Sequence, residues 1–254
     1  MRVVLNILFC TFFLVLSFYV KADNGSDMFI KANELYSAED YTAAIEAYNN
    51  ILETGHESAA LHYNLGNAYY KFNQLGEAIL HYEKAALLSP YDEDIQFNLK
   101  IARQHTVDNI SEIKPFFLAR WWAGLRDSFS SNTWCIIGVS LFWIGIGGLI
   151  FWLIGQTRTL KKQGFLAGIS AVVLSLFILT IAWQKSEIES DSGFAIIFKE
   201  QVALKNAPDN ASGDILTLHE GTKVELLDKI GEWYKVRLMN GEQGWMEVDV
   251  VEKI

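Results

Sequence analysis

The chain has few cysteines and histidines, the residue types that build cross-links and most protein metal sites. Its 254 residues include 2 cysteines and 5 histidines. Cys10 lies in an apolar N-terminal run and Cys135 in a later one, so we expect no disulfide framework. The histidines lack metal-ligand spacing, and no nucleophile–base pattern or phosphate-binding glycine loop is visible. The sequence therefore predicts no enzyme activity, no cofactor and no metal site.

Basic residues are also scarce, with 21 Lys and Arg against 30 Asp and Glu. Residues 23–114 hold 15 acidic and 6 basic side chains, a net charge of −9. Residues 185–254 hold 14 acidic and 8 basic side chains, a net charge of −6. Such stretches do not suit nucleic acid or an anionic headgroup surface, so no nucleic-acid partner is expected. The two stretches should repel each other weakly.

Three long apolar runs interrupt this acidic chain. The first covers 3–20, follows Arg2 and closes on Val20-Lys21-Ala22. This pattern predicts a signal peptide over 1–22 with cleavage after Ala22. An uncleaved membrane anchor is the alternative, because the run is long and ends in a lysine.

The other two runs are long enough to cross a bilayer. Trp134–Ile154 has 21 residues and Phe165–Trp183 has 19, all without charge. At about 1.5 Å per residue, each spans a hydrocarbon core of about 30 Å as a helix. Gly164 and Gly168 have the spacing that lets helices approach closely, and we expect them to pack the two spans together rather than to drive dimers.

The loop predicted between the spans, 155–164, sets their orientation. It contains Arg158, Lys161 and Lys162 and no acidic residue. A short positively charged loop lies in the cytoplasm, so both flanking domains, with a linker at 184–193, should lie on the opposite side. A signal peptide predicts the same topology.

A 34-residue self-similarity precedes the spans, with Phe29–Leu52 repeated as Tyr63–Ala86. The two copies match at Ala32/Gly66, Asn33/Asn67, Leu35/Tyr69, Tyr41/Leu75, Ala44/Ala78 and Tyr48/Tyr82. A period of this length with small residues at fixed offsets is typical of stacked two-helix units, and Pro90 ends the second copy. The pattern resembles the tetratricopeptide repeat. We predict this domain over 23–104, with 92–103 as a capping helix because Lys100 replaces Ala32 and Gly66.

In such repeats the first helix of each pair lines a peptide-binding groove. By this resemblance the groove candidates are Asn33, Tyr36, Asn64, Asn67, Tyr70 and Lys71. The alternative is that the asparagines satisfy local backbone groups and the tyrosines pack. Relatives that clamp a C-terminal carboxylate need basic residues where this chain has Phe29, Asp94 and Asn98, so a basic or neutral peptide is the better expectation.

Aromatic and basic residues alternate at helical spacing in the juxtamembrane segment 105–133. The large apolar residues there are Phe116, Phe117, Trp121, Trp122, Leu125 and Phe129. Beside a span, this pattern predicts an amphipathic helix at the membrane interface. A helix that caps the repeat core is the alternative.

The last segment, 194–254, has short β-rich runs separated by turn signals. The runs are Phe194–Phe198, Lys223–Ile230 and Glu232–Leu238, and Asn240-Gly241 predicts a two-residue hairpin turn with two positive φ angles. Together with Gly244-Trp245-Met246, this spacing resembles the bacterial SH3-like domain. The resemblance implies a binding surface of Trp233, Tyr234 and Trp245; the alternative places Trp245 in the core. Residues 203–214 contain no aromatic residue, so a proline-helix ligand is not expected.

The complete order of segments resembles the BatE-type proteins of bacterial aerotolerance operons. It predicts a multidomain membrane protein with all-α repeats, a transmembrane α-hairpin and a small all-β SH3-like barrel. The resemblance implies a multi-pass inner-membrane scaffold with both soluble domains in the periplasm. Its partners would be von Willebrand A-domain membrane proteins and a MoxR-type ATPase, in oxidative or envelope stress. The alternative is a wall anchor whose barrel binds peptidoglycan stem peptides.

Overall fold

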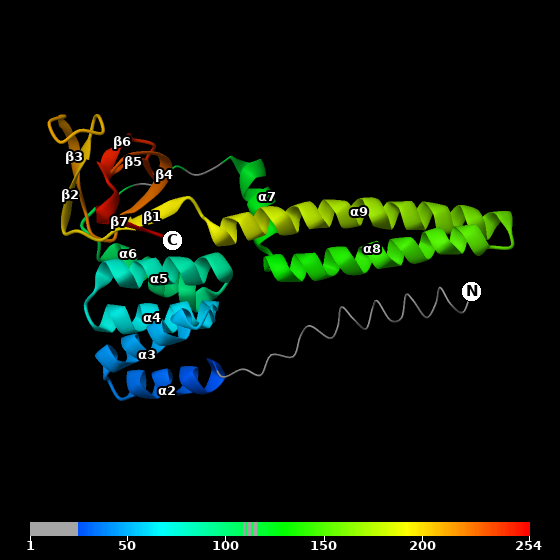
Figure 1. Cartoon of the computed structure of the whole chain (residues 1–254), viewed down its shortest axis with the longest axis horizontal. Coiled ribbons are helices and arrows are strands. Elements are labelled where there is room, and N and C mark those ends of the chain that lie inside the picture. Colours follow the sequence, from blue (N-terminus) through cyan, green and yellow to red (C-terminus); the bar gives the residue numbers. More distant parts are fainter. Residues whose placement is uncertain (1–24, 109, 111–112, 114–115) are drawn as a thin grey trace. The chain divides into compact units, whose positions relative to one another are not determined.

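The computed structural model describes residues 25–254 except 109, 111–112 and 114–115 (Figure 1). The predicted signal peptide at 1–22 lies outside the described residues. The chain divides into two compact units, residues 1–56 and residues 57–254. Each unit is described by itself.

The first unit contains the helical hairpin of the first repeat copy, α2 (Gly25–Ser37) and α3 (Tyr41–Glu53). The chain turns at Glu39, whose φ is 62°. Asp40 then caps α3 by accepting a hydrogen bond from the backbone N–H of Ala43 at 3.1 Å. Ala32 and Ala44 are both fully buried, so the small residues of the repeat lie in the helix contact.

The second repeat copy opens the second unit as α4 (Ala59–Lys71) and α5 (Leu75–Leu88). The turn between them uses Asn73 with a φ of 64°, 34 residues after Glu39 and with nearly the same angle. A Cβ on Gly66 would lie 2.8 Å from the Tyr82 ring, so only glycine permits this packing. Helix α6 (Glu93–Gln104) follows Pro90.

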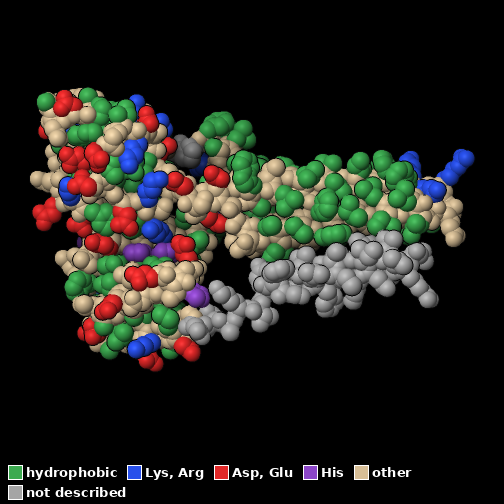
Figure 2. Space-filling model, viewed as in Figure 1, with side chains coloured by type: hydrophobic (Ala, Val, Ile, Leu, Met, Phe, Trp, Pro, Cys, Tyr) green, Lys and Arg blue, Asp and Glu red, His purple; other side chains and the backbone are tan. Residues whose placement is uncertain are grey.

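Two long apolar helices follow α7 (Phe117–Asp127): α8 (Ser131–Ile154) and α9 (Arg158–Ser190). Both are long and apolar enough to cross a membrane. Figure 2 shows hydrophobic side chains along this hairpin and basic ones gathered at its turn.

The helical hairpin differs from the predicted boundaries at both ends of α9. Only 155–157 form the connection, where a loop over 155–164 was expected, and the helix continues through most of the predicted linker at 184–193. Thr157 caps α9 by accepting a hydrogen bond from the Leu160 N–H at 3.3 Å. The reason is physical: hydropathy marks the thickness of the bilayer, whereas charged residues can extend a helix into water.

Glycines bring α8 and α9 into backbone contact. A Cβ on Gly164 would lie 2.8 Å from the Trp152 nitrogen, and one on Gly168 would lie 2.7 Å from the Leu149 nitrogen. Ser175 adds a buried hydrogen bond to the Gly138 carbonyl at 2.7 Å. The prediction that Gly164 and Gly168 pack the hairpin is confirmed.

The C-terminal domain is a seven-stranded antiparallel sheet in the order β3-β2-β6-β5-β4-β1-β7. The strands are β1 (Phe194–Ile197), β2 (Gln201–Lys205), β3 (Asp214–His219), β4 (Lys223–Ile230), β5 (Trp233–Leu238), β6 (Gln243–Glu247) and β7 (Val251–Lys253), with the short helix η2 (Val248–Val250) before β7. Side chains alternate along each strand, and those on one face form a core that includes Leu204, Leu218, Val236 and Met246.

The hairpin between β5 and β6 forms where it was predicted, but its turn is of another type. Gly241 has a φ of 91°, whereas the φ of Asn240 is not positive. The Gly241 N–H donates to the Leu238 carbonyl at 2.9 Å, and the Leu238 N–H donates to the Glu242 carbonyl at 2.8 Å. These bonds define a three-residue connection in which glycine alone takes the left-handed conformation.

The sheet domain packs against α5, although the net negative charges of the two stretches predicted weak repulsion between them. Ile196 points away from the sheet core and lies fully buried in a cluster with Ile79, Leu80 and Tyr82. Lys223 pairs with Glu83 at 2.8 Å. Apolar contact and individual ion pairs therefore outweigh the like net charges of the two segments.

Candidate functional site

An asparagine and a tyrosine form the same hydrogen bond in both repeat copies. The Tyr48 hydroxyl donates to Asn33 Oδ1 at 2.6 Å, and the Tyr82 hydroxyl donates to Asn67 Oδ1 at 2.7 Å. Each bond links the first helix of its repeat to the second. Two predicted groove residues thus have a structural partner in the helix behind them.

The groove residues predicted on α4 lie on one side of that helix. Asn64, Asn67 and Lys71 follow at intervals of three and four residues, which places them on one face. Lys71 is exposed and Asn67 is half-buried. Tyr70 is half-buried against the ring of His105, at 6.0 Å between centroids. In the first unit, the half-buried Tyr36 contacts Tyr41 with ring centroids 5.5 Å apart.

Sequence reasoning missed Asn98 and Tyr63 as members of this face. The Asn98 side-chain amide donates to Asn67 Oδ1 at 2.8 Å and to the Tyr63 hydroxyl at 3.1 Å. Asn67 Oδ1 therefore accepts two bonds, while its Nδ2 donates to no described residue. That free donor can bond the backbone carbonyl of an extended peptide. The available sequence signal for Asn98 was its position 34 residues after Asn64, one full repeat period.

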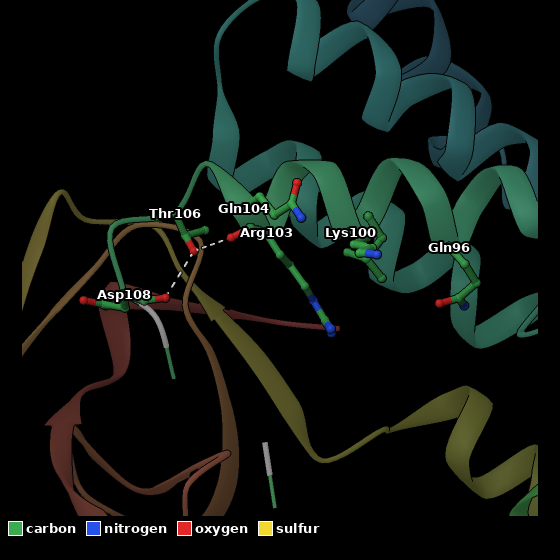
Figure 3. A pocket seen from close by; sticks show the side chains of 7 residues that line it. Gln96, Lys100, Arg103, Gln104, Thr106 and Asp108 are labelled. Atoms are coloured by element: carbon green, nitrogen blue, oxygen red, sulfur yellow. Dashed lines mark hydrogen bonds between the residues drawn. The ribbon is translucent and has the colours of Figure 1, made fainter. Parts of the chain in front are cut away.

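A pocket of about 400 Å³ opens beside α6 and the segment that leaves it (Figure 3). It is lined by Gln96, Leu99, Lys100, Arg103, Gln104, Thr106 and Asp108. The exposed Lys100 ammonium pairs with no residue that the structure describes. With the neighbouring amides, Lys100 supplies donors for a carboxylate or a peptide carbonyl.

Two anions beside this pocket connect the repeat helices to the sheet domain. Glu83 is buried and pairs with Arg103 and Lys223. Burial alone would raise the Glu83 pKa, but Lys223 and Arg103 outweigh burial and hold the pKa below its usual value. Asp108 accepts hydrogen bonds from Thr222 Oγ1 at 2.6 Å and His219 Nδ1 at 2.8 Å. Both carboxylates thus fix the position of the sheet domain.

The three aromatic residues predicted for the sheet surface divide between its two faces. Trp233 is opposite Glu247 and Lys235 is opposite Trp245, so both tryptophans lie on the outer face. Trp245 is half-buried rather than in the core, while the next residue, Met246, is fully buried. Tyr234 instead packs against the core.

Trp233 borders a shallow pocket of about 210 Å³ on this outer face. The other lining residues are Lys199, Gln201, Val202, Ala203, Lys205, Glu247 and Val250. Lys205 holds the neighbouring loop through Asp214 at 2.9 Å. An aromatic wall with ammonium and amide groups suits a short polar peptide better than an apolar one.

Two known protein families match parts of this chain. Residues 31–93 match the tetratricopeptide repeat family. Residues 200–252 match the bacterial SH3 domain. The chain thus combines a helical repeat region, two long apolar helices and a C-terminal SH3-like domain. The predicted fold class is confirmed.

Two solved structures are similar to short parts of the chain. An NlpC/P60 family protein from Bacillus cereus ATCC 10987 is 21% identical over 27% of this chain, with a TM-score of 0.21. This chain covers 23% of that protein. The C-terminal SH3 domain of myosin IB from Entamoeba histolytica is 30% identical over 21% of this chain and 90% of that one, with a TM-score of 0.16. The comparison with curated proteins gives no match.

Proposed function

We propose that the chain is a non-catalytic membrane adaptor that binds protein partners through its repeat helices and its SH3-like domain. The observation that carries this proposal is the pairing of two binding modules across a helical hairpin. Because α8 and α9 run in opposite directions and pack together, a bilayer crossed by both leaves the two modules on one side. The contact between Glu83 and Lys223, at 2.8 Å, requires the same arrangement.

The proposed side is the periplasm of a bacterial inner membrane. Arg158, Lys161 and Lys162 lie at the turn of the hairpin, and basic residues favour the cytoplasmic side. A cysteine placed at Gln156, in a chain with Cys10 and Cys135 changed to serine, should resist an impermeant maleimide in spheroplasts. A cysteine at Ile230 should react. The reverse pattern would refute the periplasmic assignment.

The resemblance to BatE-type proteins suggests the assembly in which this adaptor acts. Its partners would be von Willebrand A-domain membrane proteins and a MoxR-type ATPase, in aerotolerance or envelope stress. Crosslinking of the tagged full chain in native membranes, followed by mass spectrometry, tests this directly. Crosslinks from the repeat helices to A-domain proteins would support the proposal, whereas their absence would remove this assembly from it.

The α4 face can be tested separately from its folding role. Asn67→Ala removes the amide donor together with the bonds from Tyr82 and Asn98, whereas Tyr82→Phe removes the bond from Tyr82 and keeps the amide donor. If Asn67 binds the partner, Asn67→Ala should weaken binding about tenfold, the effect of roughly 1.4 kcal/mol. Tyr82→Phe should leave binding unchanged. Equal loss in both variants would assign Asn67 to folding alone.

The second candidate function is a wall anchor that binds peptidoglycan stem peptides. It rests on the outer-face tryptophans and the pocket beside Trp233. The full chain in detergent should then co-sediment with purified peptidoglycan, and Trp233→Ala should abolish co-sedimentation. The full chain is preferable because Ile196 would be uncovered in an isolated SH3-like domain. Wild-type protein that stays in the supernatant would exclude the function of a wall anchor.

A further inference from the structure

Helix α7 exposes an aromatic face that no described residue covers. None of its residues is buried. The exposed fractions are 59% for Phe117, 55% for Leu118 and 66% for Trp121, and Phe116, the residue before the helix, is 67% exposed. Adjacent exposed side chains of this size are unusual on a surface that faces water.

The neighbouring side of α7 packs against the α8–α9 hairpin. Trp122 packs on Phe177 of α9 with ring centroids 6.1 Å apart, and Leu125 packs on the cluster around Trp134 and Ile178. This packing agrees with the juxtamembrane interpretation, while the repeat region reaches α7 through the Tyr91 hydroxyl, which donates to the Gly124 carbonyl at 3.0 Å.

Polar contacts at the end of α7 fix its direction. The Trp134 indole donates to the Arg126 carbonyl at 2.8 Å. Asp127 lies 3.5 Å from the buried Lys185 ammonium of α9. Figure 1 shows α7 lying across the direction of α8 and α9, at the opposite end of the hairpin from its turn. If the hairpin crosses a bilayer, α7 therefore runs along the bilayer surface.

The charge of this segment has the opposite sign to the rest of the exported chain. Residues 113–133 contain Lys114, Arg120 and Arg126 but only one acidic residue, Asp127. The Arg126 guanidinium is paired with Asp127. Arg120 is exposed and has no ion-pair partner among the described residues. A cation beside exposed aromatic residues suits a phospholipid headgroup.

We infer that the exposed face of α7 is a lipid-binding surface, with Phe117 and Trp121 at the boundary of headgroups and acyl chains. In this arrangement the exposed Arg120 would bind lipid phosphates of the same leaflet. Tryptophan is enriched at this depth because its ring is largely apolar while its N–H needs a polar partner. The inference requires that α8 and α9 cross the bilayer, but it does not depend on the proposed protein partners.

Spin labels on the full chain test this assignment. With Cys10 and Cys135 changed to serine, single cysteines replace Phe117 or Trp121 and carry a nitroxide in vesicles of phosphatidylcholine and phosphatidylglycerol. Accessibility to oxygen reports lipid, and accessibility to a water-soluble nickel complex reports water. Two references frame the result: Ile144→Cys on the exposed side of α8 and Ile230→Cys on the SH3-like domain, 66% and 52% exposed respectively.

Both test labels should contact oxygen more than nickel, at a depth between the two references. Labels that match Ile230→Cys would place the face in water and overturn the inference. Protection from both reagents would show a protein cover, either a second copy or a partner, and would also overturn it. A water-exposed Ile144→Cys label would instead refute membrane crossing. Two independent positions keep the test valid if one variant fails to insert.

Discussion

In each repeat copy, one hydrogen bond joins an asparagine of the first helix to a tyrosine of the second helix. Tyr48→Phe and Tyr82→Phe each remove one such bond and leave the asparagine oxygen with one partner fewer. Each change should lower the free energy of unfolding by about 1 kcal/mol, measured as a lower urea midpoint. Tyr41→Phe is the matched control, because its half-buried hydroxyl contacts no described partner. An equal effect in the control would assign the loss to the hydroxyl group in general.

A buried histidine pair makes the second repeat sensitive to acid. His62 Nδ1 lies 3.0 Å from His81 Nδ1, and His62 Nε2 lies 3.0 Å from Glu57. One Nδ1 must donate and the other accept, so the bond is lost when both rings are protonated. Burial lowers the pKa of both histidines, and the charge of His62 lowers that of His81 further. The sequence did not reveal this pair, because helix periodicity does not tell which histidines meet.

The direction of the pH effect follows from these lowered pKa values. Below the ordinary value of 6.5 the unfolded chain binds more protons than the folded one. Stability is therefore complete above this pH and is lost as the pH falls. The urea midpoint should drop between about pH 7.5 and about pH 5.5, and His81→Phe should reduce the drop. His105→Gln, at an exposed position, should leave it unchanged. A midpoint that is flat over this range in the wild type would contradict the prediction.

At the level of elements, the α8–α9 hairpin depends on glycines that let the two helix backbones touch. Gly168→Leu would force a Cβ to within 2.7 Å of the Leu149 nitrogen on the facing helix. The backbone of the facing helix cannot move aside without strain. The substitution should therefore separate α8 from α9 and lower the stability of the hairpin by about 2 kcal/mol or more. Resistance of the full chain to SDS unfolding measures this. Gly147→Leu is the control, because a Cβ there meets no atom within 4 Å. Similar losses in both variants would disprove close packing as the cause.

Elements were predictable where one physical signal decides them. The run Lys223–Ile230 became β4 with the predicted bounds, because turn residues flank an extended β-rich run. The hairpin beside Asn240 was also predicted, but the turn type was not, since strand pairing on both sides selects the loop length. The extent of α9 was underestimated because its polar ends carry no apolar signal.

The contact between the second repeat and the SH3-like domain could not be predicted from the sequence. Net charge predicted repulsion between the acidic stretches, yet the interface places Glu83 between two cations. Ile196 looked like an ordinary strand residue, although its side chain enters the helical core. Such contacts join residues more than 100 positions apart, and no local pattern reports them. Repeat equivalence predicted the binding face on α4, and the same equivalence gives Asn98 on α6, which lies 34 residues after Asn64.

Breaking the central ion pair should loosen this interface. Glu83→Gln leaves Arg103 and Lys223 without their anion, and both remain partly in water. The expected loss is about 2 kcal/mol, less than the roughly 3–5 kcal/mol of a fully buried pair. Faster amide exchange in β1 would show it. Lys199→Ala breaks the exposed pair with Asp249 and should cost about 0–1 kcal/mol. Unchanged exchange in Glu83→Gln would contradict a role of this pair in docking.

The continuity of α9 has a mechanical consequence. Its 33 residues form an unbroken rod of about 50 Å. Only three residues separate it from β1, and near that end the Lys185 ammonium donates to the Leu87 carbonyl of α5 at 3.0 Å. A tilt or axial shift at the basic end of the rod therefore displaces the SH3-like domain and the second repeat together. If α8 and α9 cross a bilayer, force applied to the basic end of α9 on one side becomes displacement of these domains on the other.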